Sequence, residues 1–153
     1  MLKKFIKEVL VIAIAVTMWW STAYCIEGVA GNITTAEELM RSIDSKGVRA
    51  IDVRGIWDYR IGHIPGAVRI NNKEFEDPEN PIEGMIAAAE RIEALMSANG
   101  IANDDLVVIY ADNKKPQMAT RLWWVLKIYG HQKVQVLDGH YQAWADSGYH
   151  LER

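Results

Sequence analysis

Short apolar runs alternate along this chain with segments whose apolar residues recur at helical spacing. The runs at 49–54, 68–70, 106–110 and 134–137 are rich in β-branched residues and predict strands. Helical spacing predicts helices from the capping box at Thr35 up to Gly47, and over 56–61, 82–98, 118–129 and 141–146. This alternation predicts an α/β fold with a mainly parallel sheet.

Ligands of such sheets bind outside the carboxyl ends of the strands. The segments that follow Val53, Tyr110 and Leu137 are therefore the places to search for a site. The run LVVIY at 106–110 is apolar throughout, as expected of a central strand that is covered on both faces.

The first 26 residues follow a different pattern. Three lysines precede Val9, and no charged side chain occurs from Val9 to Ile26. The strongly apolar part, Val9 to Trp20, has the length of a signal-peptide hydrophobic region, and small residues at Ser21 and Ala23 suit cleavage after Ala23. The sequence therefore predicts a hydrophobic helix at the N-terminus, which is either cleaved or retained.

A retained membrane anchor is the second interpretation, with Trp19, Trp20 and Tyr24 as its aromatic belt. Both interpretations keep the lysines in the cytoplasm and place residues 27–153 outside it, in the periplasm or anchored to the membrane. Lipidation of Cys25 is a lesser alternative, because the residue before such a cysteine is normally small and here it is Tyr24. A buried core helix fits the basic head and unbroken apolar run poorly.

Composition and charge exclude several classes of function. The chain has 153 residues and a formal net charge of −3; residues 1–26 carry +2, so residues 27–153 carry −5. The latter form one domain of ordinary size and show no basic excess for nucleic acid. A single cysteine excludes an internal disulfide and a cysteine-based zinc site, and the four histidines lack the spacing of metal ligands. The sequence predicts neither a metal nor a cofactor.

Several motifs resemble the rhodanese family. The first half contains DVR at 52–54, Tyr59 and GHIPGA at 62–67. The second half contains LVVIY at 106–110, RLWW at 121–124, YGH at 129–131 and VLDG at 136–139, followed by Trp144. The resemblance covers about residues 33–152. It implies a rhodanese fold, a five-stranded, mainly parallel sheet with helices on both faces.

The resemblance also implies sulfurtransferase chemistry, in which a cysteine at the start of the loop after the strand 106–110 carries a sulfane sulfur. A thiolate is needed there because it is nucleophilic and can hold the persulfide. This chain has Ala111 at the matching position, or Asp112 if the strand ends one residue later, and neither accepts sulfur. Cysteine-dependent phosphatases of the same fold fail for the same reason.

Two other residues are alternatives to the missing nucleophile, Cys25 and Asp112. Cys25 would have to leave the N-terminal segment, which argues against it. Asp112 is an alternative as a phosphoryl-accepting carboxylate, but such sites usually have a second carboxylate two residues later, where this chain has Lys114. A solvated aspartate in a turn is the simpler interpretation.

The loop is still a candidate anion site. Strand-to-helix turns point amides outward, and the next helix adds its positive end. Lys114 and Lys115 add charge, while Pro116 removes one amide. The predicted ligand is a small anion (thiosulfate, sulfate or phosphate), and the predicted contacts are Ala111, Asp112, Asn113, Lys114, Lys115 and Gln117.

Three residues are predicted to flank this pocket. Asp52 and Arg54 stand at a strand end, where the resemblance implies that they tie loops to the sheet. His140 occupies a position where the family usually has glycine, so its side chain is expected to fill part of the pocket or present a new polar group.

The other conspicuous side chains have structural explanations. His63 is expected to fix a turn, and His131 to cap the last carbonyls of a helix. Trp123, Trp124 and Trp144 are expected in or over the core.

Three functions remain open. The first is a non-catalytic, extracytoplasmic binding or regulatory module. The second is a sulfur-transfer activity that depends on the thiol of a partner protein. The third is an interaction subunit of a membrane redox complex. The sequence favours the first of these functions, then the third, and then the second.

Overall fold

The computed structural model describes residues 31–153, so the predicted signal peptide or anchor at 1–26, with Cys25, lies outside the described residues. The five strands are β1 (Ile33–Thr34), β2 (Val48–Asp52), β3 (Val68–Arg69), β4 (Leu106–Tyr110) and β5 (Val134–Leu137). They form one sheet in the order β1-β5-β4-β2-β3, and every pair is parallel. The predicted parallel α/β architecture is confirmed.

The helices are α2 (Ala36–Ser42), α3 (Ile56–Ile61), α4 (Ala89–Ala98), α5 (Gln117–Ile128) and α6 (His140–Asp146), with a 3-10 turn at Asn72–Glu74. The capping box predicted at Thr35 is present, since its side chain accepts from the Glu38 amide and Glu38 binds the Thr35 amide. Helix α2 ends at Ser42, earlier than the apolar spacing up to Gly47 predicts.

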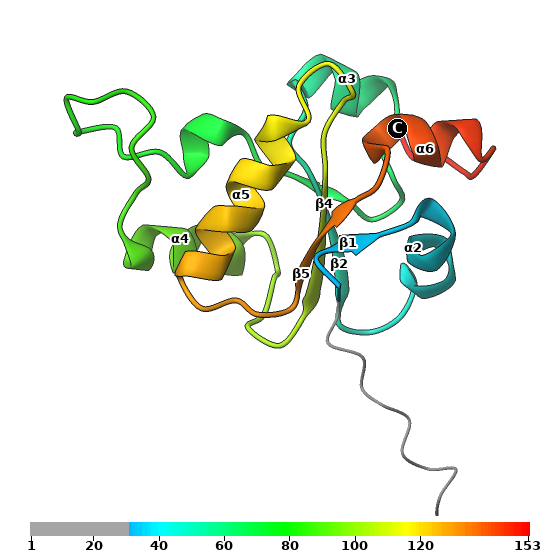
Figure 1. Cartoon of the computed structure of the whole chain (residues 1–153), viewed down its shortest axis with the longest axis horizontal. Helices are drawn as coiled ribbons and strands as arrows, with labels where there is room; N and C mark the ends of the chain where they lie inside the picture. The colour runs from blue at the N-terminus through cyan, green and yellow to red at the C-terminus, as the bar shows by residue number, and fades with distance from the viewer. Residues whose placement is uncertain (1–30) are drawn as a thin grey trace, which may run out of the picture.

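Side-chain alternation along the central strand divides the core in two. Val107 and Ile109 face α4 and α5, whereas Val108 and Tyr110 face α2 and α6. Figure 1 shows these helices on opposite sides of the sheet, with α3 near the end where the loop after β4 turns into α5. Both faces are thus covered, and the carboxyl edge of the sheet is left for loops.

The predicted helix over 82–98 begins only at Ala89. The preceding backbone bonds to other parts of the fold: the Ala87 amide donates to Phe75 O at 3.0 Å, and the Tyr129 hydroxyl donates to Ala87 O at 2.7 Å. These tertiary contacts replace the helical hydrogen bonds over 82–88, a choice that apolar spacing does not reveal.

The strand Ile33–Thr34 was also missed by the sequence pattern. Two residues give no periodicity, and the strand exists because it pairs with β5, where Ile33 lies opposite Val136. It forms one edge of the sheet, next to β5 (Figure 1).

Candidate functional site

The loops that follow β2 and β4 enclose a pocket at the carboxyl edge of the sheet. The register places Asp52 opposite Tyr110, so the segments after these residues emerge side by side. The pocket has a volume of about 270 Å³. Its lining combines the predicted Arg54, Ala111, Asp112 and Lys115 with Val53, Gly55, Asp58, Asn71, Asn72 and Met118.

Arg54 and Asp52 form a buried ion pair beneath this pocket. The Arg54 Nε atom lies 3.1 Å from both carboxylate oxygens, and Nη2 lies 2.7 Å from Oδ2. Nη2 also donates to Gly62 O at 2.7 Å, and the guanidinium lies 3.7 Å from the ring centroid of Tyr141. The pair thus ties the end of α3 and the start of α6 to the sheet, the structural role expected of it.

Burial opposes the charge of Arg54. The hydrogen bonds and the negative charge of Asp52 outweigh that effect and raise the pKa of the guanidinium. The positive charge is therefore fixed and already neutralised, which leaves little of it for a ligand in the pocket.

Ala111 stands directly after β4 and is only 2 % exposed. Its amide donates to His140 Nδ1 at 3.4 Å, and its carbonyl accepts from the Tyr141 amide at 3.1 Å. Both backbone groups are therefore fixed by α6. The side chain at the floor of the pocket is a methyl group, with no atom that can accept or donate sulfur.

The carboxylate of Asp112 occupies the amides of its own loop. Oδ1 accepts from the amide of Lys114 at 2.7 Å and from that of Lys115 at 2.8 Å. Pro116 has no amide to offer, and the side chains of Asn113, Lys114, Lys115 and Gln117 are exposed. An incoming anion would have to compete with Asp112 for the same two donors.

His140 is the single non-glycine residue with a positive φ within residues 31–153, at +51°. Burial lowers the pKa of its ring, while the nearby charges of Asp112 and Asp138 oppose this shift. The ring is largely neutral near pH 7, which suits its role as acceptor of the Ala111 amide.

Sequence reasoning missed the contribution of the segment after β3. Asn72 reaches the pocket with its Nδ2 on the sulfur of Met118, and its Oδ1 is buried without a hydrogen-bond partner among the described residues. Asp58 enters from α3. No motif marks Asn72, because it joins the site through the pairing of β3 with β2.

Two histidines were predicted to have structural roles. His63 fixes its turn as expected, with Nδ1 3.0 Å from Tyr59 O and its ring stacked on Tyr59. His131 caps a carbonyl of the last turn of α5 as predicted, because its backbone amide donates to Leu126 O at 2.9 Å. Its ring lies 3.0 Å from Asp105 O, in the loop before β4.

The three tryptophans differ in burial. Trp144 is fully buried and Trp123 is partly buried, as predicted, but Trp124 is 51 % exposed. The side chains of adjacent helical residues point about 100° apart, so Trp123 and Trp124 cannot both face the core.

Within residues 31–153, no group of three or more His, Cys, Asp or Glu side chains is arranged to hold a metal ion. No helix of this region has both the length and the apolarity needed to cross a membrane.

Comparison with known proteins supplies the family. The model of the rhodanese-like domain matches residues 35–147. A thiosulfate/3-mercaptopyruvate sulfurtransferase of Arabidopsis thaliana is 39 % identical over 97 residues, which are 63 % of this chain and 28 % of that protein. The thiosulfate sulfurtransferase of Corynebacterium glutamicum is 35 % identical over 113 residues, 73 % of this chain and 36 % of that protein.

A solved structure agrees with these matches. The 3-mercaptopyruvate sulfurtransferase SseA from Escherichia coli superposes with a TM-score of 0.74 at 27 % identity, over 80 % of this chain and 50 % of the other. This chain therefore spans between about a quarter and half of the length of these three relatives.

Proposed function

The chain belongs to the rhodanese-like domain family, and we propose that within it this domain carries no sulfur of its own and serves as a binding or regulatory module. The observation that carries the proposal is Ala111. It lies at the end of β4, where the family resemblance implies the sulfur-carrying cysteine, and it lines the pocket with a methyl group.

Its neighbour does not replace the missing thiol. Persulfide formation needs a soft, ionisable atom, and a carboxylate is a hard oxygen nucleophile. The Asp112 carboxylate is moreover engaged with two amides of its own loop. The similarity to sulfurtransferases supports the fold of this domain. The proposed function follows from the side chains of this chain in the loop after β4.

The proposed ligand is a small anion such as thiosulfate, sulfate or phosphate. Lys115 lies at the pocket and supports this choice, and the exposed Lys114 adds positive charge on the same loop. The carboxylates of Asp58 and Asp112 line the same pocket and oppose it. We therefore expect weak binding that falls steeply with salt.

The proposed location is outside the cytoplasm, as a periplasmic or membrane-anchored domain. The basic head and the uncharged run from Val9 to Ile26 support this placement. The choice between a cleaved signal peptide and an anchor stays a prediction.

A second candidate is sulfur transfer that uses the thiol of a partner protein. The pocket favours it in one respect: with a methyl group at Ala111, space of about 270 Å³ is left beside the loop. A partner's thiolate would enter that space and attack the sulfane sulfur of a thiosulfate that this domain positions, which forms the partner's persulfide and releases sulfite.

The test is persulfide detection by intact-mass spectrometry after exposure to thiosulfate, followed by a cyanide turnover assay. The full chain with Cys25→Ser removes the one natural thiol. We expect no sulfur adduct and no turnover from it. A sulfur adduct or turnover in this variant overturns the proposal.

Ala111→Cys and Asp112→Cys, made in the Cys25→Ser background, are the matched variants. A sulfur adduct on either shows that the scaffold still supports the chemistry and that the nucleophile alone is missing. Turnover by Cys25→Ser only in the presence of an added thiol protein would favour the second candidate.

A further inference from the structure

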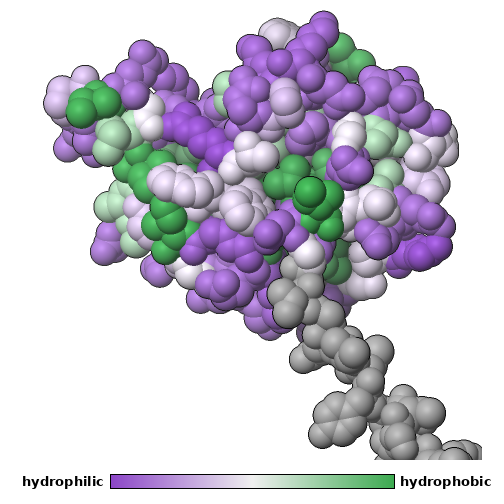
Figure 2. All heavy atoms as spheres, in the orientation of Figure 1, coloured by the Kyte–Doolittle hydropathy of each residue, from purple (hydrophilic) through white to green (hydrophobic). Residues whose placement is uncertain are grey.

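An apolar groove of about 530 Å³ lies between α5 and the edge strand β1. Its apolar walls come from Ile33, Trp123, Trp124 and Val136, and Asn32, Thr120, Asp138 and His140 complete the lining. Ile33 is 65 % exposed and Trp124 is 51 % exposed. Figure 2 looks onto this face, where hydrophobic surface gathers around α5 and beside β1.

The groove has a rigid floor. The Trp123 indole donates to Val134 O at 3.1 Å and packs against the core under the sheet edge. On the outward side of α5, Trp124 is followed one turn later by Ile128, which is 50 % exposed. A surface helix normally turns polar residues outward, so this second apolar stripe on α5 indicates a contact surface.

The chain itself indicates what that surface meets. The uncharged run Val9–Ile26 is separated from Gly31 by only four residues, 27–30. A fully extended connection of this length spans at most about 17 Å. Ile33, a wall of the groove, follows two residues after Gly31, so any membrane that holds the run lies within reach of the groove.

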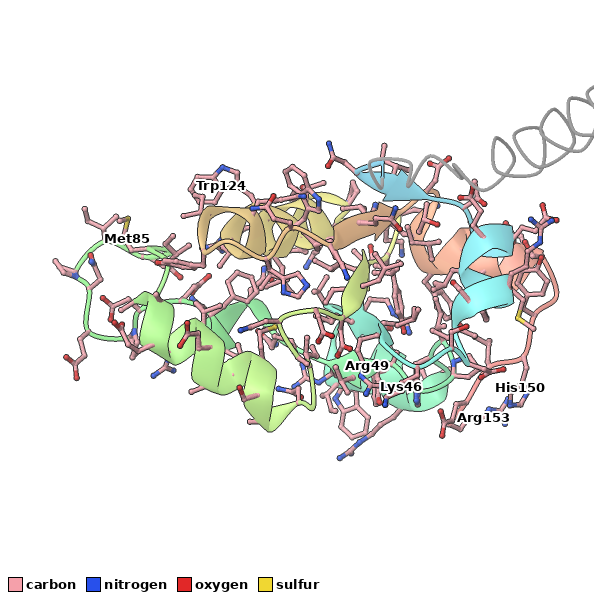
Figure 3. All side chains as sticks on the ribbon, turned by 90° about the horizontal axis from the view of Figure 1, so that it is seen from below. Lys46, Arg49, Met85, Trp124, His150 and Arg153 are labelled. Carbon is pink, nitrogen blue, oxygen red and sulfur yellow. The ribbon has the colours of Figure 1, made fainter. Side chains whose placement is uncertain are left out.

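The chemistry of the face fits the boundary between lipid headgroups and acyl chains. Indole side chains are enriched at that depth, and isoleucine favours the acyl side. Figure 3 shows Trp124 on the same flank as β1, while Lys46, Arg49 and Arg153 lie on the opposite flank. These three basic side chains thus lie away from the groove.

We propose that the face formed by Ile33, Trp124 and Ile128 docks on the surface of the membrane that holds residues 9–26. This inference rests on the proposed membrane placement of that run. It goes beyond that placement, because it fixes the orientation of the domain: the groove faces lipid, and the flank of Lys46 faces away.

The test uses the full chain with Cys25→Ser in vesicles of phosphatidylethanolamine and phosphatidylglycerol. A single cysteine is introduced by Thr120→Cys beside the groove, or by Lys46→Cys on the opposite flank as the control, and carries an environment-sensitive fluorophore. Lipids with a spin label on the acyl chain should quench the label at 120 several-fold more than the label at 46. Adding Ile33→Ser and Trp124→Ser should abolish this difference while the chain still sediments with the vesicles.

Equal quenching at both positions overturns the docking and leaves the membrane placement intact. Shielding at 120 that depends on protein density and not on spin-labelled lipid assigns the face to a second copy and also overturns it. A chain that stays in the supernatant overturns the membrane placement and the docking together. None of these outcomes affects the test for a sulfur adduct. The proposal that the domain carries no sulfur is therefore tested independently of the docking.

Discussion

The imidazole of His140 accepts the backbone amide of Ala111, with Nδ1 3.4 Å from the nitrogen. A side chain from the first position of α6 thereby closes the end of β4. His140 adopts φ +51° to do so, a conformation that costs a non-glycine residue about 1 kcal/mol. The contact makes His140 part of the loop's architecture, since a protonated Nδ1 would place two donors against each other.

This contact predicts a pH dependence of stability. Burial lowers the pKa of His140 below its ordinary value of 6.5, so protonation favours the unfolded chain. The stability that it contributes is complete above 6.5 and is lost as the pH falls from 6.5 through the lower pKa of the folded state. His140→Asn keeps an acceptor and tolerates a positive φ, and it should flatten this part of the curve of unfolding free energy against pH. Unfolding free energies are measured by urea titration at each pH. The same dependence of this free energy on pH in both proteins would contradict the assignment.

Arg54 offers a sharp test of the ion pair under the pocket. Arg54→Met leaves the Asp52 carboxylate, which is fully buried, without its partner. We expect a loss of about 3–5 kcal/mol in unfolding free energy, measured by urea denaturation. Arg60→Met on the exposed side of α3 is the matched control, with a change below about 0.5 kcal/mol. Similar losses of unfolding free energy in both variants would show that the buried pair of Asp52 and Arg54 contributes no more to stability than an exposed arginine does.

The sequence predicted those parts of the fold that depend on local patterns. The run 106–110 is β4 because it is apolar throughout and both its faces are covered. The capping box at Thr35 begins α2 because its hydrogen bonds join residues three apart. Motif spacing also brought Arg54 and Ala111 to one pocket, since both follow neighbouring parallel strands.

Features that depend on distant contacts were missed. The segment 82–88 forms no helix, and Ala87 within it bonds to Phe75 and Tyr129. Asn72 reaches the pocket through sheet pairing alone. Asp112 was predicted to lie in a turn, but which amides its carboxylate accepts from depends on the turn geometry after β4.

Tyr110 predicts a second, smaller effect on stability. Its ring is fully buried, and its hydroxyl accepts from the Ile64 amide at 3.1 Å. Burial raises the pKa of Tyr110, so the hydroxyl stays protonated. Tyr110→Phe should cost about 1–3 kcal/mol because a buried amide loses its acceptor. Tyr129→Phe, whose hydroxyl is part-buried on Ala87 O, should cost less, and the reverse order in thermal unfolding would contradict this account.

The last prediction concerns the carboxylate that occupies the loop amides. Asp112→Ala removes one negative charge from the pocket and frees the amide of Lys114, while the amide of Lys115 keeps its bond of 3.2 Å to the carbonyl of residue 112. One charge-assisted hydrogen bond contributes about 1.5–3 kcal/mol, so sulfate and thiosulfate affinity should rise about tenfold or more. Calorimetric titration at low salt measures the change. Asp138→Ala removes an exposed carboxylate near His140 without touching these amides, and it controls for charge alone. Equal gains in both variants would mean that net charge, and not the occupied amides, limits anion binding.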